Sequence, residues 1–208
     1  MEKQQTLEMK ITPMPLGVMV VKFELPDVLI DNINKAYDSH KENMPAHNDE
    51  LAGKIEEEKL VNDILTEEMK GIFLGCFKKY LEIAQKPFWR CAPENAWINE
   101  MKSGEYNHMH YHTSRTTDLG LSSVLMLKRP DWYGVEVSKQ EKPANGWLEF
   151  VGGDQSPLAM SQLRVDAQVG AFYVFPYSLM HGVYPFNSTD EVRRTLSYNC
   201  DLIQIKGK

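Results

Sequence analysis

Three of the six histidines of the chain lie close together at positions 108, 110 and 112, in the segment Gly-Glu-Tyr-Asn-His-Met-His-Tyr-His. Side chains alternate between the two faces of an extended strand, so we expect these three imidazoles to project from one side. A fourth histidine, His181, lies far downstream in Phe-Pro-Tyr-Ser-Leu-Met-His-Gly-Val-Tyr-Pro. Imidazole is the commonest metal ligand in proteins. The pattern predicts a metal site with close ligands on one strand and one distant ligand.

The types of residue around these histidines bear on which metal they would hold. Non-haem iron oxygenases bind iron through two histidines and one carboxylate and leave other positions open. Here His110-x-His112 has histidine where that carboxylate usually lies, and Glu105 and Asp118 do not have the required spacing. Three histidines with one open position also describe catalytic zinc. We take His110, His112 and His181 as candidate ligands, and spacing alone leaves iron and zinc open.

An arginine pair follows His181 in the strand-like segment Val-Arg-Arg-Thr-Leu-Ser-Tyr-Asn. Strand alternation places Arg193 and Thr195 on one face and Arg194 on the other. A guanidinium binds a carboxylate through two parallel hydrogen bonds, and a nearby hydroxyl adds a donor. The alternative is that both arginines are surface residues at the start of a strand. The histidines in the same chain favour an Arg193 clamp for an anionic co-substrate.

The second half of the chain must supply the strands that position these residues. After residue 90, glycine, proline and aromatic residues become frequent and apolar runs shorten to strand length. Short strands separated by turns are typical of a sandwich or barrel. We expect a polar insertion over 134–146 to form a lip over the site. The expected strands are 96–102, 106–113, 121–128, 146–151, 162–165, 170–175, 181–185 and 193–204.

The first 90 residues are expected to form an α-rich supporting region. Residues 6–11 and 18–23 have the composition of short strands around a proline-rich turn. Apolar residues at helical spacing predict one helix from Pro26 to about His40 and another from about Thr66 to Gln85. Residues 41–60 are expected to form a surface loop with a short helix from near Glu57, and the acidic run 56–58 a solvated face. Without a linker or repeat, residues 1–208 are expected to form one domain, with 1–90 supporting a β-rich core over 91–208.

Composition excludes several classes of protein. The hydrophobic content of 42% and charged content of 25% are ordinary for a globular fold. A net charge of −6 argues against nonspecific nucleic-acid binding, which needs a basic surface. The three cysteines are widely spaced, which favours buried reduced thiols. The first residues do not resemble a signal peptide, and no apolar run approaches the roughly 20 residues of a membrane helix. We expect a soluble cytoplasmic protein without membrane contact.

Over residues 95–204 the sequence resembles the 2-oxoglutarate- and Fe(II)-dependent dioxygenases, in particular a group of oxygenases common in tailed bacteriophages and bacteria. Each matching segment is short, and their order and spacing together carry the resemblance. The segments are Trp97-Ile98-Asn99, Gly104, His110-Tyr111-His112, Leu121-Ser122-Ser123-Val124, Gly146-Trp147-Leu148-Glu149-Phe150, Gly170-Ala171-Phe172-Tyr173-Val174-Phe175-Pro176, His181-Gly182-Val183-Tyr184-Pro185 and Arg193-Arg194-Thr195-Leu196-Ser197-Tyr198-Asn199.

The resemblance implies a mainly β, α+β fold with a double-stranded β-helix core (jelly-roll, cupin-like) behind N-terminal supporting helices. It implies Fe(II) and 2-oxoglutarate as cofactors, and a hydroxylase-type oxidation of an unidentified substrate coupled to decarboxylation of 2-oxoglutarate to succinate. His110 and His181 correspond to family ligands. His112 would be the third ligand in place of the usual carboxylate, which leaves the site one charge more positive.

The resemblance also implies residues for the co-substrate. Arg193 would bind the distal carboxylate of 2-oxoglutarate, with Thr195 as helper. Tyr106 and Asn99 are further candidates for contacts with 2-oxoglutarate. His108 is expected to lie near the site without binding the metal.

Two other hypotheses stay open at this stage. One is a three-histidine cupin-type dioxygenase that does not use 2-oxoglutarate, in which Arg193 would bind the substrate instead. The other is a non-catalytic jelly-roll that serves as a structural or interaction protein. Jelly-roll proteins often dimerise, so a homodimer is one assembly to consider, and a phage-encoded protein would work in the host cytoplasm.

Overall fold

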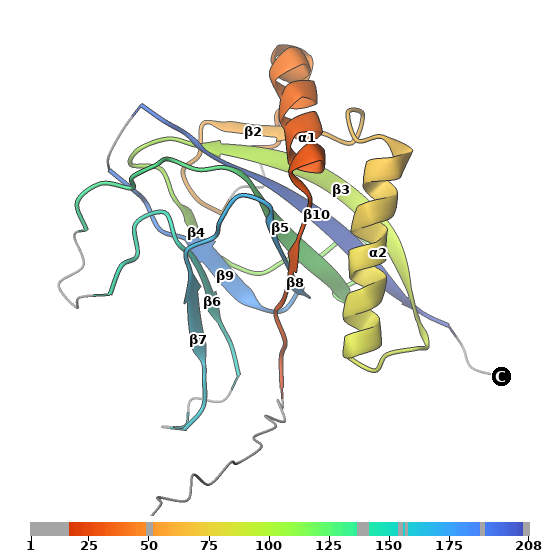
Figure 1. Cartoon of the computed structure of the whole chain (residues 1–208). Helices are drawn as coiled ribbons and strands as arrows, with labels where there is room; N and C mark the ends of the chain where they lie inside the picture. Colours follow the sequence, from red (N-terminus) through yellow and green to blue (C-terminus); the bar gives the residue numbers. More distant parts are fainter. Residues whose placement is uncertain are drawn as a thin grey trace, which may run out of the picture.

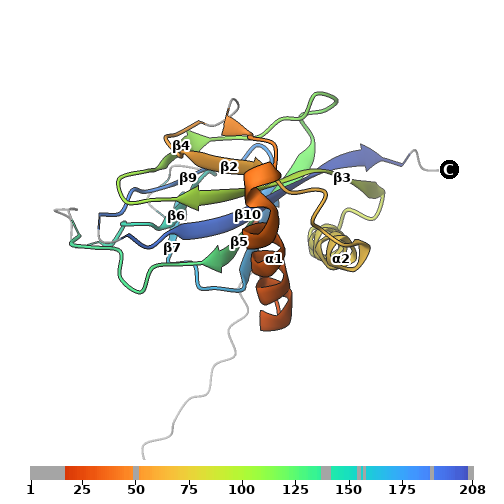
Figure 2. The same cartoon turned by 90° about the horizontal axis from the view of Figure 1, so that it is seen from above.

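The computed structural model describes residues 17–48, 52–136, 142–153, 156, 158–187 and 190–205. Within these residues, two antiparallel sheets face each other, and two α-helices lie on the outside of the larger one (Figures 1 and 2). The larger sheet has the order β1 (Val21–Glu24), β8 (Ala171–Pro176), β5 (Gly120–Lys128), β10 (Arg193–Gln204), β3 (Trp89–Met101) and β2 (Glu57–Leu60). The smaller has the order β4 (Asn107–His110), β9 (Met180–Val183), β6 (Leu148–Val151) and β7 (Gln162–Val165).

The eight strands expected after residue 90 are all present. Most boundaries differ by one or two residues, but β3 begins at Trp89 instead of 96 and β4 ends at His110 instead of 113. The long strands β3 and β10 pair along almost their whole length and form the centre of the larger sheet. An expected strand over 6–11 lies outside the described residues, as do residues 137–141 of the polar insertion.

The helices α1 (Asp27–His40) and α2 (Glu67–Ile83) confirm the two helical predictions. The hydroxyl of Thr66 accepts a hydrogen bond from the backbone N–H of Met69, which caps α2. Apolar stripes of both helices pack on the outer face of the larger sheet, where Phe73 meets Phe172 with ring centroids 5.3 Å apart. No helix of the described residues has the length and apolarity to cross a membrane.

Residues 57–60 differ from the prediction. They form the edge strand β2, which pairs with β3 so that Glu58 lies opposite Asn99. The expected short helix near Glu57 is therefore wrong, because pairing with a neighbouring strand overrides local preference. The acidic run is not a solvated face either. Only Glu56 is exposed, and Glu58 is 3% exposed on the inner face of the sheet.

Arg194 joins the first helix to the larger sheet. This residue is 3% exposed, and its Nη2 donates to Glu100 at 2.8 Å and to Asp38 at 2.6 Å. Its Nη1 donates to Asn34 of α1, and its guanidinium lies 4.6 Å from the ring centre of Tyr37. The hypothesis that both arginines are surface residues is wrong, since Arg193 is also buried.

Replacing Arg194 by alanine is expected to lower the free energy of unfolding by about 3 kcal/mol, the lower end of the range for breaking a buried ion pair. The lower end applies because Lys41 still contacts Glu100 at 3.1 Å. Urea denaturation measures the change. Lys22→Ala, which removes an exposed pair with Glu24, should leave stability nearly unchanged. Equal effects of the two substitutions would contradict the role of Arg194.

Candidate active site

Three histidine rings meet between the two sheets. His110 ends β4 and is the register partner of His181 on β9, with ring centroids 4.3 Å apart. His112 lies just beyond β4, and its backbone N–H donates to the carbonyl oxygen of Tyr177. The Nε2 atoms of His112 and His181 are 3.2 Å apart, and ligand atoms from all three rings lie within 4.8 Å of one another. The structure thus brings together the three predicted ligands.

The partners of the Nδ1 atoms determine which nitrogens face the shared space. Nδ1 of His110 lies 2.6 Å from the carbonyl oxygen of His108, and Nδ1 of His181 lies 3.0 Å from that of Leu179. A carbonyl oxygen only accepts, so both Nδ1 atoms carry the proton and both Nε2 atoms keep a lone pair. Histidines that bind metals through Nε2 are held in this way by backbone carbonyls. The donor set fits a cation between the rings.

Asn199 on β10 is the corresponding partner of His112. Its side-chain amide lies 3.5 Å from Nδ1 of His112, and its Oδ1 has no hydrogen-bond partner among the described residues. A half-turn of the amide exchanges its nitrogen and oxygen, which places Oδ1 toward an Nδ1 proton. In that orientation His112 also turns the lone pair of Nε2 toward the other two rings.

Burial keeps the three rings uncharged. It lowers the pKa of His110, and it lowers the pKa of His112 to about 3 together with the nearby charge that His110 can carry. The pKa of His181 is also far below its ordinary value, first because of burial and then because of the other two histidines. Neutral imidazole is the form that binds a metal, so the site is ready for a cation at neutral pH.

The prediction that His108 projects beside His110 and His112 is wrong. Between Asn107 and His110, β4 contains one residue more than the paired segment of β9, and this bulge reverses the alternation of side chains. His108 is exposed, and its ring packs on Tyr106 with centroids 4.6 Å apart. The group of potential ligands found among the described residues does not include His108, in agreement with the expectation that it is not a ligand.

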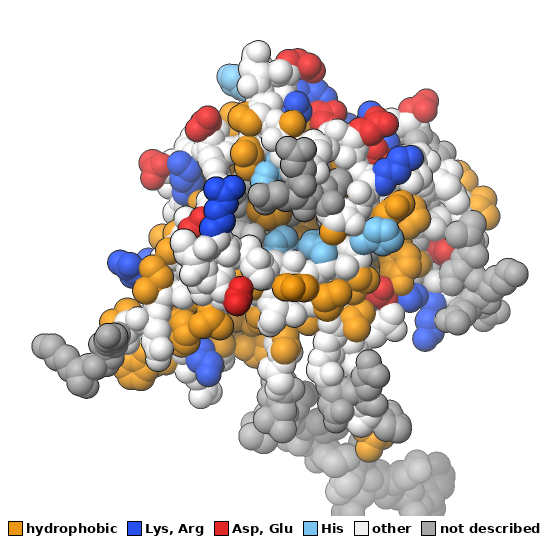
Figure 3. Space-filling view, turned by 180° about the vertical axis from the view of Figure 1, so that it is seen from behind, with side chains coloured by type: hydrophobic (Ala, Val, Ile, Leu, Met, Phe, Trp, Pro, Cys, Tyr) orange, Lys and Arg blue, Asp and Glu red, His pale blue; other side chains and the backbone are white. Residues whose placement is uncertain are grey.

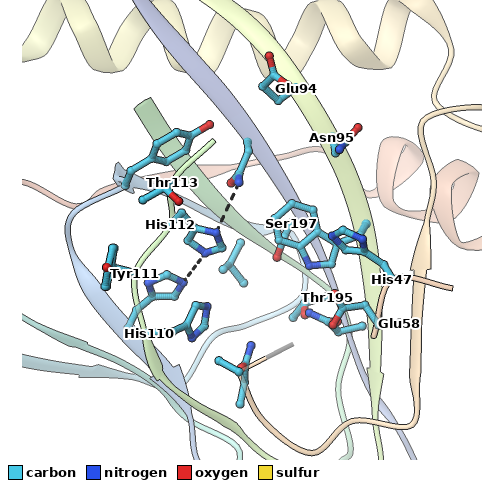
Figure 4. Close-up of a pocket in the computed structure, with 18 of the residues that line it drawn as sticks. His47, Glu58, Glu94, Asn95, His110, Tyr111, His112, Thr113, Thr195 and Ser197 are labelled. Carbon is cyan, nitrogen blue, oxygen red and sulfur yellow. Dashed lines mark hydrogen bonds between the residues drawn. The ribbon is translucent and has the colours of Figure 1, made fainter. Parts of the chain in front are cut away.

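The three histidines line a cavity of about 600 Å³ between the sheets. Figure 3 shows histidine side chains at a hollow on this face of the molecule. Figure 4 shows His110 and His112 on one side of the cavity, with Thr195 and Glu58 on the other. The polar residues that the larger sheet contributes to its lining include Glu58, Asn99, Thr195, Ser197 and Asn199.

Arg193 lies on the same strand face as Thr195 but is fully enclosed, with 2% exposure. Its Nε donates to the carbonyl oxygen of Gly146 at 2.9 Å, and its Nη2 has no hydrogen-bond partner among the described residues. Burial lowers its pKa, and the neighbouring phenol of Tyr133 acts in the opposite direction. A buried guanidinium nitrogen without an acceptor is costly. A ligand carboxylate would satisfy it, which is the feature that fits 2-oxoglutarate.

The two further co-substrate candidates are placed differently. Asn99 lines the cavity next to Thr195 on the neighbouring strand and is 6% exposed. Tyr106 does not line it. With His108 it borders a smaller, more open groove of about 320 Å³ beside β4 and β9, because the chain at Tyr106 pairs with Lys54 before the bulge.

A buried network fixes the segment that follows His112, and sequence reasoning missed it. Asp201 accepts from Ser114 at 2.8 Å and Thr116 at 2.6 Å, and from the hydroxyl of Tyr177 at 3.0 Å. The sequence contained a signal for Asp201, because side-chain alternation along the strand places it on the same face as Arg193. Glu58 gave no such signal, because β2 has no apolar alternation.

Replacing Asn199 by alanine is expected to weaken Co(II) binding about 10- to 100-fold, the usual effect of removing a group that orients a metal ligand. The reason is that His112 loses the acceptor that holds its proton on Nδ1. Asn199→Asp, which keeps an acceptor at the same place, should retain binding. Titration of the visible cobalt absorption measures both. Wild-type affinity in Asn199→Ala would contradict the orienting role.

Without metal, the free energy of unfolding is expected to fall as the pH is lowered below 6.5, the ordinary histidine value. The unfolded chain then takes up protons at His112 and His181, but burial holds both neutral in the folded chain. Stability rises with pH where the unfolded state binds more protons, by up to about 1.4 kcal/mol per pH unit for each group. Urea denaturation between about pH 5 and 7 should show a steeper slope for the wild type than for a His112→Gln, His181→Gln double variant. Parallel slopes would refute this.

Comparison with known proteins agrees with this geometry. A family model described as "Putative 2OG-Fe(II) oxygenase" matches residues 95–199, about half of the chain. A comparison with curated protein sequences finds no match.

Several solved structures share the fold. A prolyl-4-hydroxylase of Pseudomonas putida is similar with a TM-score of 0.58 and 15% identity, over 90% of this chain and 93% of that one. A viral collagen prolyl hydroxylase of Paramecium Bursaria Chlorella virus-1, solved as a 2OG complex, has a TM-score of 0.55 and 13% identity, over 88% and 96%. A prolyl hydroxylase of Trichoplax adhaerens, in complex with a peptide fragment of hypoxia inducible factor, has a TM-score of 0.57 and 10% identity, over 88% and 83%. The expected double-stranded β-helix is confirmed, and the chain belongs to the 2OG-Fe(II) oxygenase family, whose cofactors are Fe(II) and 2-oxoglutarate.

Proposed function

We propose that His110, His112 and His181 hold Fe(II) in this cavity and that Arg193 and Thr195 bind 2-oxoglutarate, for a hydroxylase-type oxidation of a substrate. The observation that carries the proposal is the convergence of three histidine ligand atoms at a cavity, together with a buried guanidinium on the strand face of Thr195, which lines that cavity. Fe(II) with 2-oxoglutarate would supply dioxygen activation: the co-substrate takes up one oxygen atom and loses carbon dioxide to become succinate, and the other oxygen atom oxidises the substrate.

The chain's own residues would bind and orient the reactants. Thr195 faces the cavity with a hydroxyl donor, and Arg193 offers an unused N–H in an enclosed position. Charge-assisted hydrogen bonds of this kind are strong, and they would fix the far end of the co-substrate. Apolar side chains of Val124 and Leu148 line the same cavity and would limit the water around it.

The neutral third ligand changes the electrostatics of the proposed site. With His112 in place of a carboxylate, the bound metal would keep its full double charge. Such a site attracts a dianionic co-substrate more strongly than the usual one. The same charge is less suited to stabilising higher oxidation states, so we propose a more positive redox potential than that of relatives with a carboxylate.

Other assignments remain predictions beside this one. We still predict that Asn99 contacts 2-oxoglutarate directly, that residues 1–208 form a single domain, and that a homodimer is one assembly to consider. A cupin-type enzyme without 2-oxoglutarate is not favoured, because the family match covers the site residues. The acidic net charge of −6 supports a substrate other than nucleic acid.

Arg193→Met is expected to weaken 2-oxoglutarate binding by about 2–5 kcal/mol, the usual cost of removing one partner of a buried charge pair. Methionine keeps most of the volume and removes the charge, so the fold should persist. Anaerobic titration of Fe(II)-loaded protein with 2-oxoglutarate measures it through the weak visible charge-transfer band. Arg164→Met on β7, where Arg164 contacts Glu149 and Tyr184, serves as the control. A wild type that forms no band would overturn the proposed function, and an unchanged Arg193→Met would overturn only the role of Arg193.

A further inference from the structure

The wall of the cavity across from the histidines has a row of polar residues on adjacent strands. Glu58 on β2 is the register partner of Asn99 on β3, and Asn99 is the register partner of Thr195 on β10. Neighbouring strands lie about 4.8 Å apart, so the three side chains stand next to one another. All three line the cavity and are at most 6% exposed.

One atom on this row, in Asn99, is an acceptor that the co-substrate cannot satisfy. Oδ1 of Asn99 is buried and has no hydrogen-bond partner among the described residues. Its neighbour Glu58 brings a carboxylate, which when ionised only accepts hydrogen bonds. 2-Oxoglutarate is itself a dianion without donors, so it suits Arg193 and Thr195 and is repelled by Glu58. The group that fits beside Glu58 and Asn99 is a donor with positive charge.

An aromatic side chain lies next to these acceptors. Trp97 precedes Asn99 by two residues on the same face of β3 and also lines the cavity. Its ring centre is 5.9 Å from that of His112, a proposed metal ligand, and 5.4 Å from that of His47, which also lines the cavity. The indole therefore lies between these two histidines. The face of an indole attracts ammonium and guanidinium groups.

A second carboxylate lies at the mouth. Opposite Asn199, β3 carries one residue more than β10, and this bulge turns both Glu94 and Asn95 toward the cavity. Among the described residues that line the cavity, Arg115 is the one lysine or arginine, and it is exposed. Exposed charges are screened by water and salt, whereas Glu58 is enclosed. Glu94 is exposed as well, so apart from the histidines the one enclosed acidic or basic side chain on the described lining is Glu58. Arg193 is not part of this lining and is assigned to 2-oxoglutarate.

We propose that the substrate oxidised in this cavity carries a cationic nitrogen, an alkylammonium or a guanidinium, which Glu58 and Asn99 bind against the indole of Trp97. This inference rests on the proposed function, because it assigns the substrate of the same site. The cationic group could come from a free amino acid or from a lysine or arginine residue of a peptide, and the two sources share the chemistry that the wall recognises.

The test compares cationic ligands with neutral ligands of similar shape. The Fe(II) and 2-oxoglutarate complex is titrated without oxygen with L-lysine against L-norleucine and with L-arginine against L-citrulline, and the shift of the charge-transfer band is followed. The same four side chains are then tested within a short glycine-flanked peptide. We expect at least one cationic member to bind about tenfold or more tightly than its neutral partner, since hydrogen-bonded charges contribute on this scale. A preference confined to peptides identifies a protein substrate, and one shown by free amino acids identifies a small molecule.

A substitution at Glu58 tests the residue itself. Glu58→Gln keeps shape and removes charge, and it should abolish the preference for the cationic member while the 2-oxoglutarate band still forms. Glu56→Gln, on the same segment but exposed, is the matched control and should keep the preference. Equal binding of cationic and neutral ligands by the wild type, or a preference that survives in Glu58→Gln, overturns the inference. The band alone decides the proposed function, so the two failures are distinguishable.

Discussion

The pairing of β4 with β9 is the constraint on which the site depends. It sets His110 directly opposite His181, and backbone carbonyls two residues earlier in the chain hold both Nδ1 protons. The lone pairs of Nε2 are thereby aimed before any metal binds, and burial keeps the rings neutral. A shift of the register by one residue would turn His110 to the opposite face.

The two faces of the larger sheet have different roles: the outer face packs against the helices, and the inner face lines the cavity. On the outer face, leucine, tyrosine and cysteine of β10 pack with the helices, and Arg194 ties α1 to the sheet through Asp38 and Glu100. On the inner face, the alternate residues Thr195 and Asn199 line the cavity. One strand can serve both purposes because its side chains alternate. The helices packed on the outer face support the sheet whose inner face lines the cavity.

Two bulges adapt this regular frame to the site. The bulge in β4 turns His108 away from the ring cluster and leaves His110 in place. The bulge in β3 brings Glu94 toward the cavity beside Asn95. An extra residue changes the direction of side chains locally without ending the sheet, which is why such irregularities occur beside functional sites.

The sequence by itself determined the strands after residue 90, both helices and the grouping of His110, His112 and His181, because periodicity and residue type are local properties. It did not determine that Glu58 lies inside a cavity, since β2 becomes a strand only by pairing with β3. Nor did it show that Tyr106 lies outside the cavity or that Asn199 reaches His112, because both depend on a bulge or on contact between distant strands. The local periodicity of apolar residues determined which helices and strands form, and the pairing of distant strands determined which side chains come into contact.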